Sequence, residues 1–119
     1  MHLDHTIVPS HDKVGSAKFF ARIMGVEYKG EHGPFAPVEI GNLSFDFDDR
    51  REVAHHHYAF MVTDDEFDDI FGRVKAEGLR YGSGPRPENR YDMTLNDRRG
   101  GRGVYFDDPN GHSIELMTK

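Results

Sequence analysis

Cysteine and tryptophan are both absent from this chain of 119 residues. Without cysteine, the chain cannot form a disulfide framework, a cysteine-ligated zinc site or a cysteine nucleophile, and it suits a reducing compartment. The longest apolar run, residues 58–62, is far shorter than the roughly 20 residues that span a bilayer. The N-terminal Met-His-Leu-Asp-His lacks the basic and apolar segments of a secretory signal. We therefore expect a soluble, cytoplasmic protein that does not contact membranes.

Positive charge is scarce as well. The chain has 15 lysines and arginines against 21 acidic residues, which gives a formal net charge of −6. Nucleic acids and anionic membranes bind basic surfaces, so neither is an expected partner. A chain of this length buries roughly two-thirds of its unfolded surface and can form one domain with its own core. The residue type that stands out is histidine, which occurs eight times.

The order strand, helix, paired strands is predicted twice along the chain. In the first half, these elements are expected at residues 3–8, 14–24, 35–40 and 43–47. In the second half, strands are expected at residues 57–62, 103–106 and 113–117. The helix between the first two is expected to begin at the capping-box sequence Thr63–Glu66 and to end at Gly78. Equivalent residues recur 52 or 53 positions apart: His5 with His57, Gly25 with Gly78, and Tyr28 with Tyr81. This period occurs only twice, which indicates one domain made of two similar halves.

Each predicted half opens with a strand histidine and closes with a strand carboxylate. The first half has His5 and Asp46, and the second half has His57 and Glu115. Imidazole nitrogen and carboxylate oxygen bind divalent metals, and two histidines with one carboxylate form the facial triad of open catalytic sites. The pattern therefore indicates a metal site made of nitrogen and oxygen ligands.

Strand alternation is compatible with such a site. Glu115 lies on the opposite face of its strand from Ile114 and Leu116, and His57 lies on the opposite face from Phe60. The apolar face of each strand suits packing against a helix. A carboxylate between apolar neighbours is costly to bury unless a partner compensates its charge, and a cation would be such a partner.

The run His57-Tyr-Ala-Phe60 and the run Gly103–Leu116, with its Asp108-Pro-Asn-Gly-His-Ser-Ile-Glu115 motif, resemble the vicinal oxygen chelate superfamily. That group holds glyoxalase I, fosfomycin-resistance thiol transferases, extradiol dioxygenases and metal-free bleomycin-binding proteins. The resemblance covers nearly the whole chain. It implies an α+β fold in which two βαβββ modules form a cupped mixed sheet around a divalent metal. We expect a single domain over residues 1–119, with modules at about 1–50 and 55–119.

The resemblance also implies roles for particular residues. Carried over to this sequence, it implies His5, His57 and Glu115 as ligands of a divalent ion (Fe, Mn, Ni or Zn) and Tyr105 as a substrate contact. In the thiol-transferase members the first-strand histidine comes from the partner subunit, so we expect a homodimer. Whether the modules pair within or between chains is open. Asp46 lies about where glyoxalase I members have a fourth ligand, but it is one methylene shorter, and its role is open too.

A loop rich in glycine and arginine precedes the last strands. Its arginines, Arg98, Arg99 and Arg102, could bind an anionic group of a substrate. We expect Arg102 to bind substrate together with Tyr105. The loop superficially resembles an RNA-binding segment, but the acidic chain and the single short stretch argue against that function.

Together these residues predict a divalent-metal-dependent enzyme of glyoxalase or dioxygenase type. It would chelate a small oxygenated substrate through two oxygens and stabilise an oxyanion or enolate. Glu115 is the expected catalytic residue as well as a ligand. One alternative is a fosfomycin-type thiol transferase, although Ile7 and the loop at 96–103 differ from those enzymes. The other is a metal-free protein of bleomycin-resistance type that binds an antibiotic.

Overall fold

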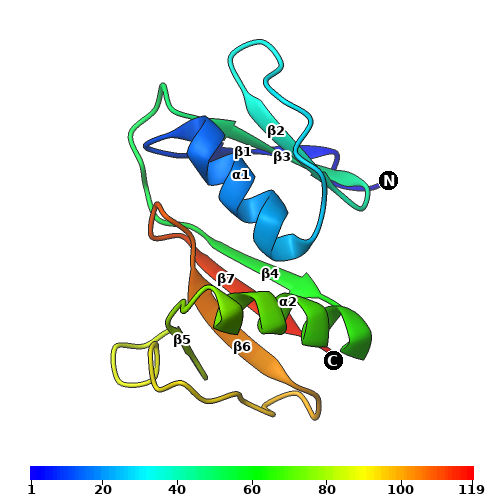
Figure 1. Ribbon diagram of the computed structural model, residues 1–119, viewed down its shortest axis with the longest axis vertical. Coiled ribbons are helices and arrows are strands. Elements are labelled where there is room, and N and C mark those ends of the chain that lie inside the picture. Colours follow the sequence, from blue (N-terminus) through cyan, green and yellow to red (C-terminus); the bar gives the residue numbers. More distant parts are fainter. The chain divides into compact units, whose positions relative to one another are not determined.

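The computed structural model describes residues 1–119, and the chain divides into two compact units, Met1–Ala54 and His55–Lys119 (Figure 1). The elements in chain order are β1 (His5–Pro9), α1 (Lys13–Met24), β2 (Ala36–Ile40), β3 (Leu43–Asp48), β4 (His57–Met61), α2 (Asp64–Ala76), β5 (Tyr81–Gly82), β6 (Gly103–Asp107) and β7 (Ser113–Met117). The first unit has a mixed sheet in the order β1-β3-β2, and the second has one in the order β4-β7-β6-β5. The predicted α+β class is confirmed. Neither helix is long and apolar enough to cross a membrane.

The two units follow one plan with one difference. The second unit has the full predicted order β-α-β-β-β, whereas the first has β-α-β-β. The segment of the first unit that corresponds to β5 contains Gly30, Gly33 and Pro34, and it forms only an isolated bridge between His32 and Phe35. Glycine and proline are poor strand formers, which accounts for the missing strand.

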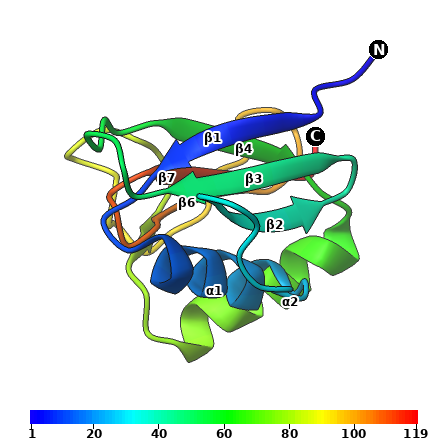
Figure 2. The same cartoon turned by 90° about the horizontal axis from the view of Figure 1, so that it is seen from above.

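In the first unit, α1 lies against one face of the sheet, as Figures 1 and 2 show, and buried side chains such as Phe20 and Phe45 form the core. The Phe20 ring of α1 stacks on Phe45 of β3 with ring centroids 4.8 Å apart, and it lies 5.8 Å from Phe47. Phe45 and Phe47 point to the same face because side chains alternate along a strand. The opposite face of β3, which carries Ser44 and Asp46, is left for other contacts.

Local signals set the ends of α1. The Asp12 side chain accepts a hydrogen bond from the Gly15 backbone N–H, which satisfies a donor that a helix start leaves unpaired. At the other end, Gly25 has a φ of 76°, the left-handed conformation that glycine adopts without a Cβ penalty. The contacts of Asp12 and Gly25 therefore set where the helix begins and ends.

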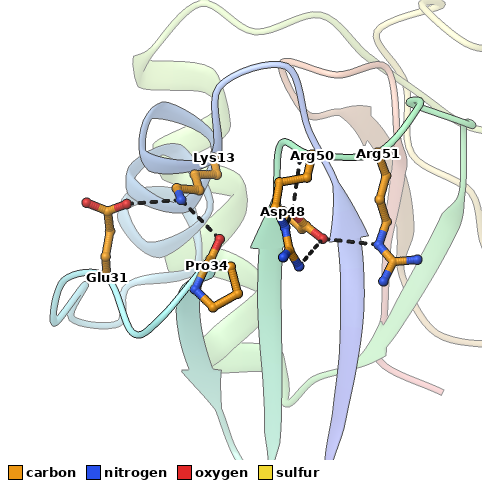
Figure 3. Close-up of polar contacts among 6 residues, drawn as sticks. All are labelled: Lys13, Glu31, Pro34, Asp48, Arg50 and Arg51. Atoms are coloured by element: carbon orange, nitrogen blue, oxygen red, sulfur yellow. Dashed lines mark hydrogen bonds and ion pairs between the residues drawn. The ribbon is translucent and has the colours of Figure 1, made fainter.

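A buried carboxylate closes β3. The Asp48 side chain is fully buried and accepts hydrogen bonds from Arg50 and Arg51 (Figure 3). The Arg50 backbone N–H also donates to it, at 3.0 Å. The Arg50 side chain is the main reason that the pKa of Asp48 lies well below its usual range, and the Arg50 backbone and Arg51 add to the effect. This cluster fixes the turn that leaves the first sheet.

In the second unit, α2 covers one face of the sheet (Figure 2). It begins with the predicted capping box: the Glu66 N–H donates to Thr63 Oγ1 and the Thr63 N–H donates to Glu66 Oε1. Its buried side chains are Phe67, Ile70 and Val74, which recur at helical spacing. In β7, Ile114 and Leu116 are buried, and the residues between them are partly exposed, as the alternation predicted.

The turn between β6 and β7 is held by Asp108. Its carboxylate accepts hydrogen bonds from the backbone N–H groups of Asn110 and His112 and from the Asn110 side chain. His112 is fully buried, and its Nδ1 accepts a hydrogen bond of 3.0 Å from the His56 backbone N–H. Because Nδ1 is the acceptor, the His112 ring carries its proton on the other nitrogen. The turn thus ties the start of β4 to the start of β7.

Candidate functional site

The candidate site lies on the face of the second sheet opposite the buried Ile114 and Leu116. Glu115 at the centre of β7 is paired with Ala59 of β4 on one side and with Tyr105 of β6 on the other. Directly paired residues point to the same face of a sheet. His57 lies two residues before Ala59 and shares that face. The strand register therefore gathers His57, Glu115 and Tyr105 from three different strands.

His57 and Glu115 meet directly. Nε2 of His57 is 2.9 Å from Oε1 of Glu115, while 47% of the His57 side chain and 15% of the Glu115 side chain remain exposed. Two donors bound at right angles about 2.1 Å from one ion would lie about 3.0 Å apart, so the observed separation suits neighbouring ligands of a metal. Nitrogen and oxygen donors also match the divalent ions expected from the sequence. The residues present therefore fit such an ion.

Tyr105 lies next to His57 and Glu115. Its side chain is buried, and its ring centroid lies 5.7 Å from that of His57. Burial raises the pKa of the Tyr105 hydroxyl above its usual value, and a hydrogen bond to Glu115 raises it further. At neutral pH the hydroxyl is therefore protonated and donates to the Glu115 carboxylate. This hydrogen bond holds Glu115 in place from the side of β6.

A loop covers the open face next to Tyr105. Asn96 and Gly103 pair through their backbones, which closes the intervening segment into a compact loop. Residues 96–102 and the open faces of β6 and β7 enclose a pocket of about 240 Å³, with Tyr105, Glu115 and Met117 in its wall. The predicted ligand Glu115 and the predicted substrate contact Tyr105 thus face one cavity.

Arg102 lines the same pocket, but its guanidinium contacts side chains of α2. Its guanidinium donates to Asp68 at 2.6 Å and to Asp64 at 3.0 Å, and it lies 4.4 Å from the centre of the Phe67 ring. Two carboxylates therefore neutralise the charge that was expected to bind substrate. Arg98 has no such partner: it donates to the Ser83 carbonyl at 3.0 Å, and its guanidinium lies 5.3 Å from the centre of the Tyr105 ring. The sequence analysis chose Arg102 as the substrate contact, but the sequence does not show that its charge is paired with Asp64 and Asp68.

His5, the third predicted ligand, belongs to the first unit. Its Nδ1 lies 2.9 Å from the Asp4 carboxylate, a hydrogen bond that raises the pKa of His5, with a smaller contribution from Asp46. Asp46 accepts a 2.7 Å hydrogen bond from Ser44 Oγ, and His5, Ser44 and Asp46 line one pocket. No third histidine or acidic side chain joins either unit's pair closely enough to complete a metal site. The structure therefore brings two of the three predicted ligands together, and His5 lies beside Asp46.

The two units carry matching arrangements. His5 is paired with Ser44 across parallel strands, and His57 is paired with Ser113 in the same way. Asp46 and Glu115 each lie two residues beyond that serine. The histidine and the carboxylate thus occupy equivalent register positions in both sheets, which is the structural counterpart of the internal repeat.

Comparison with known proteins agrees with this architecture. The structure named Oxidase ChaP-H2 is 48% identical to this chain, with a TM-score of 0.91, over 100% of this chain and 94% of the other. The structure named Oxidase ChaP-H1 is 42% identical, with a TM-score of 0.90, over 100% of this chain and 96% of the other. A more distant relative is Metallothiol transferase FosB of Lysinibacillus sphaericus (strain C3-41), which is 20% identical over 98% of this chain and 81% of that protein.

A sequence profile extends the comparison to a whole family. The profile described as the Glyoxalase/Bleomycin resistance protein/Dioxygenase superfamily matches residues 2–116. That match includes both units and every predicted site residue. The resemblance inferred from the motifs in β4, β6 and β7 is confirmed: the chain belongs to the Glyoxalase/Bleomycin resistance protein/Dioxygenase superfamily.

Proposed function

We propose that this protein is a divalent-metal-dependent oxidoreductase of dioxygenase type that acts on a small oxygenated substrate. The observation that carries the proposal is the pair formed by His57 and Glu115 at 2.9 Å, beside a pocket that Glu115 itself lines. The 48% identity to a protein named as an oxidase favours oxidative chemistry over the glyoxalase type. Both types were expected from the sequence.

In this proposal, His57 and Glu115 are two ligands of the ion and His5 is the third. The first unit that supplies His5 belongs either to the same chain or to the partner subunit of the expected homodimer. When bound, the ion supplies Lewis-acid chemistry: it holds two oxygens of the substrate and stabilises the negative charge that develops on them. Fe, Mn, Ni and Zn all accept this set of ligands. Asp46 is a possible further ligand from the first unit.

The remaining residues of the site act on Glu115 and on the substrate. The Tyr105 hydroxyl donates to Glu115 and so orients the carboxylate. Metal ligands in proteins are commonly oriented by such hydrogen-bonding neighbours. Ala59, which has a small side chain, is paired with Glu115 on its other side. Met117 gives the pocket an apolar wall. These features suit a substrate with an apolar body and two adjacent oxygens.

A thiol transferase is the second candidate. It is favoured by the relative named Metallothiol transferase FosB, which matches 98% of this chain. The chain has no cysteine, so the thiol would come entirely from a co-substrate. This reaction consumes a thiol and an electrophile, whereas the dioxygenase reaction consumes dioxygen. Measuring the consumption of thiol and of dioxygen therefore distinguishes the two candidates.

The test is a panel of three reactions run on the protein reconstituted with each of the four metals. The panel contains catechols with dioxygen, the hemithioacetal of methylglyoxal and glutathione, and fosfomycin with a thiol. We expect oxygen consumption with a catechol-type substrate, a loss of about 100-fold in Glu115→Gln and no loss in Glu88→Gln, a matched change at an exposed position. Turnover of the thiol mixture alone would favour the second candidate. Tight binding of an antibiotic without turnover in any reaction would favour the metal-free binding protein.

A further inference from the structure

The pocket between the loop at 96–102 and strands β6 and β7 has an unusual charge for this chain. The protein as a whole has a formal net charge of −6, yet the pocket is lined by one acidic side chain, Glu115, and by four basic residues, Arg98, Arg99, Arg102 and Lys119. A cleft lined by charge of one sign attracts ligands of the opposite sign. The pocket is therefore a local cationic site in an acidic protein.

Only part of this positive charge is neutralised. Arg102 is paired with Asp64 and Asp68. Arg98 has a backbone carbonyl and the ring and hydroxyl of Tyr105 as its partners, and Arg99 donates to the Met117 sulfur at 3.2 Å. Neither of these two guanidinium groups is paired with a carboxylate. Two adjacent arginines thus keep their full charge at one end of the pocket.

Neighbouring residues orient the Arg98 side chain. The Arg98 backbone N–H lies 3.3 Å from Asn96 Oδ1, and the Asn96 side chain donates to the same Ser83 carbonyl that Arg98 uses. A guanidinium that is already oriented loses less entropy when it binds, and its planar fork matches the two oxygens of a carboxylate. The surrounding wall, formed by Tyr105 and Met117, favours an apolar, planar body. A ligand that has both a carboxylate for the guanidinium and a flat apolar body for this wall is an aromatic carboxylate.

We propose that Arg98 and Arg99 form an anion subsite that binds the carboxylate of an aromatic substrate while the rest of the substrate extends toward Glu115. This inference deepens the proposed function and rests on it, because it names the substrate class of the same site. Arg102 has a structural role instead: its ion pairs with Asp64 and Asp68 hold the end of the loop at 96–102 against α2. The subsite selects anionic substrates over neutral ones of the same shape.

The subsite is tested with two probes of equal shape, 2-naphthoate and its neutral counterpart 2-naphthamide. Each is titrated into the metal-free protein at pH 7 while the backbone amide signals of residues 96–103 are followed by NMR. We expect saturable binding of 2-naphthoate at these residues and about tenfold weaker binding of 2-naphthamide. Arg99→Gln and Arg98→Gln should each remove most of this difference, because glutamine keeps the polar side chain and loses the charge. Arg86→Gln, a change in an exposed loop outside the pocket, should leave it intact.

Equal affinity for the two probes, or a difference that both pocket variants retain, would overturn the proposal. The metal content of the same variants separates this result from the fate of the proposed function. If Arg99→Gln loses its preference for 2-naphthoate and still binds metal as the wild type does, both inferences stand. If the wild type prefers 2-naphthoate but binds no metal, the anion subsite stands and the metal-dependent function fails.

Discussion

Replacing Gly82 by alanine gives the sharpest stability prediction for the long segment between α2 and β6. Gly82 is the second residue of β5 and is paired with Tyr105 of β6. A Cβ at this position would lie closer than 3.0 Å to the backbone oxygens of Asn89 and Arg90. Backbone atoms cannot rotate away as a side chain can, so the whole segment at 89–90 would have to move.

The surrounding hydrogen bonds oppose that movement. The backbone N–H groups of Asn89 and Arg90 both donate to the Arg86 carbonyl. The Arg90 guanidinium and the Tyr91 hydroxyl both donate to Asp107 at the end of β6. Overpacking a well-fitted site costs 1–3 kcal/mol and sometimes more, and here we expect a loss of about 3 kcal/mol in the free energy of unfolding. For a chain of this size the loss corresponds to a fall of roughly 10 °C in Tm.

Thermal unfolding followed by circular dichroism measures this effect, and Gly72→Ala is the matched control. Gly72 lies within α2, and a Cβ there meets no atom within 4 Å. Alanine favours a helix over glycine by up to about 1 kcal/mol, so this variant should raise Tm. The two identical substitutions should therefore shift Tm in opposite directions. A Gly82→Ala protein with the Tm of the wild type would refute the close packing of Gly82 against the segment at 89–90.

Two further predictions concern the helix start and the buried acid. Thr63→Ala removes one half of the capping box of α2 and should lower the stability by about 1 kcal/mol in a denaturant titration, whereas Thr63→Ser should retain most of it. Asp48→Asn should destabilise the protein at pH 7, because the asparagine leaves Arg50 and Arg51 without a charged partner. The folded pKa of Asp48 lies below its ordinary value of 3.8, so its contribution is full above that pH and is lost as the pH falls below it. The stability gap between Asp48→Asn and the wild type should therefore close in acid, and a gap that persists unchanged to pH 2 would contradict this origin.

Features that depend on a few neighbouring residues were predictable from the sequence. The capping box at Thr63 and Glu66, the left-handed Gly25 and the turn that starts at Asp108 each form through contacts within five residues. The alternation in β7 also predicted which face carries Glu115. The internal repeat predicted that His5 and His57 occupy equivalent strands of the two halves, and they lie at the starts of β1 and β4.

Features that depend on distant segments were not predictable. β5 has only two residues, too few for a periodic pattern, and its Tyr81 contacts Phe71 in an edge-to-face arrangement. The sequence does not show that Arg102 is paired, because its partners, Asp64 and Asp68, come more than 30 residues earlier. The different partners of Arg98 and Arg102 therefore follow from tertiary contacts, which could not be inferred from this single sequence.

The central claim is that His57 and Glu115 hold a divalent metal. The most direct test is elemental analysis of the wild type, His57→Ala and His55→Ala, each reconstituted anaerobically and freed of unbound metal by gel filtration. His55 is an exposed histidine two residues from His57 and is the matched control. We expect roughly one ion per chain in the wild type and in His55→Ala, and less than about a tenth of that in His57→Ala. A wild type without metal, or equal metal content in all three proteins, would contradict it.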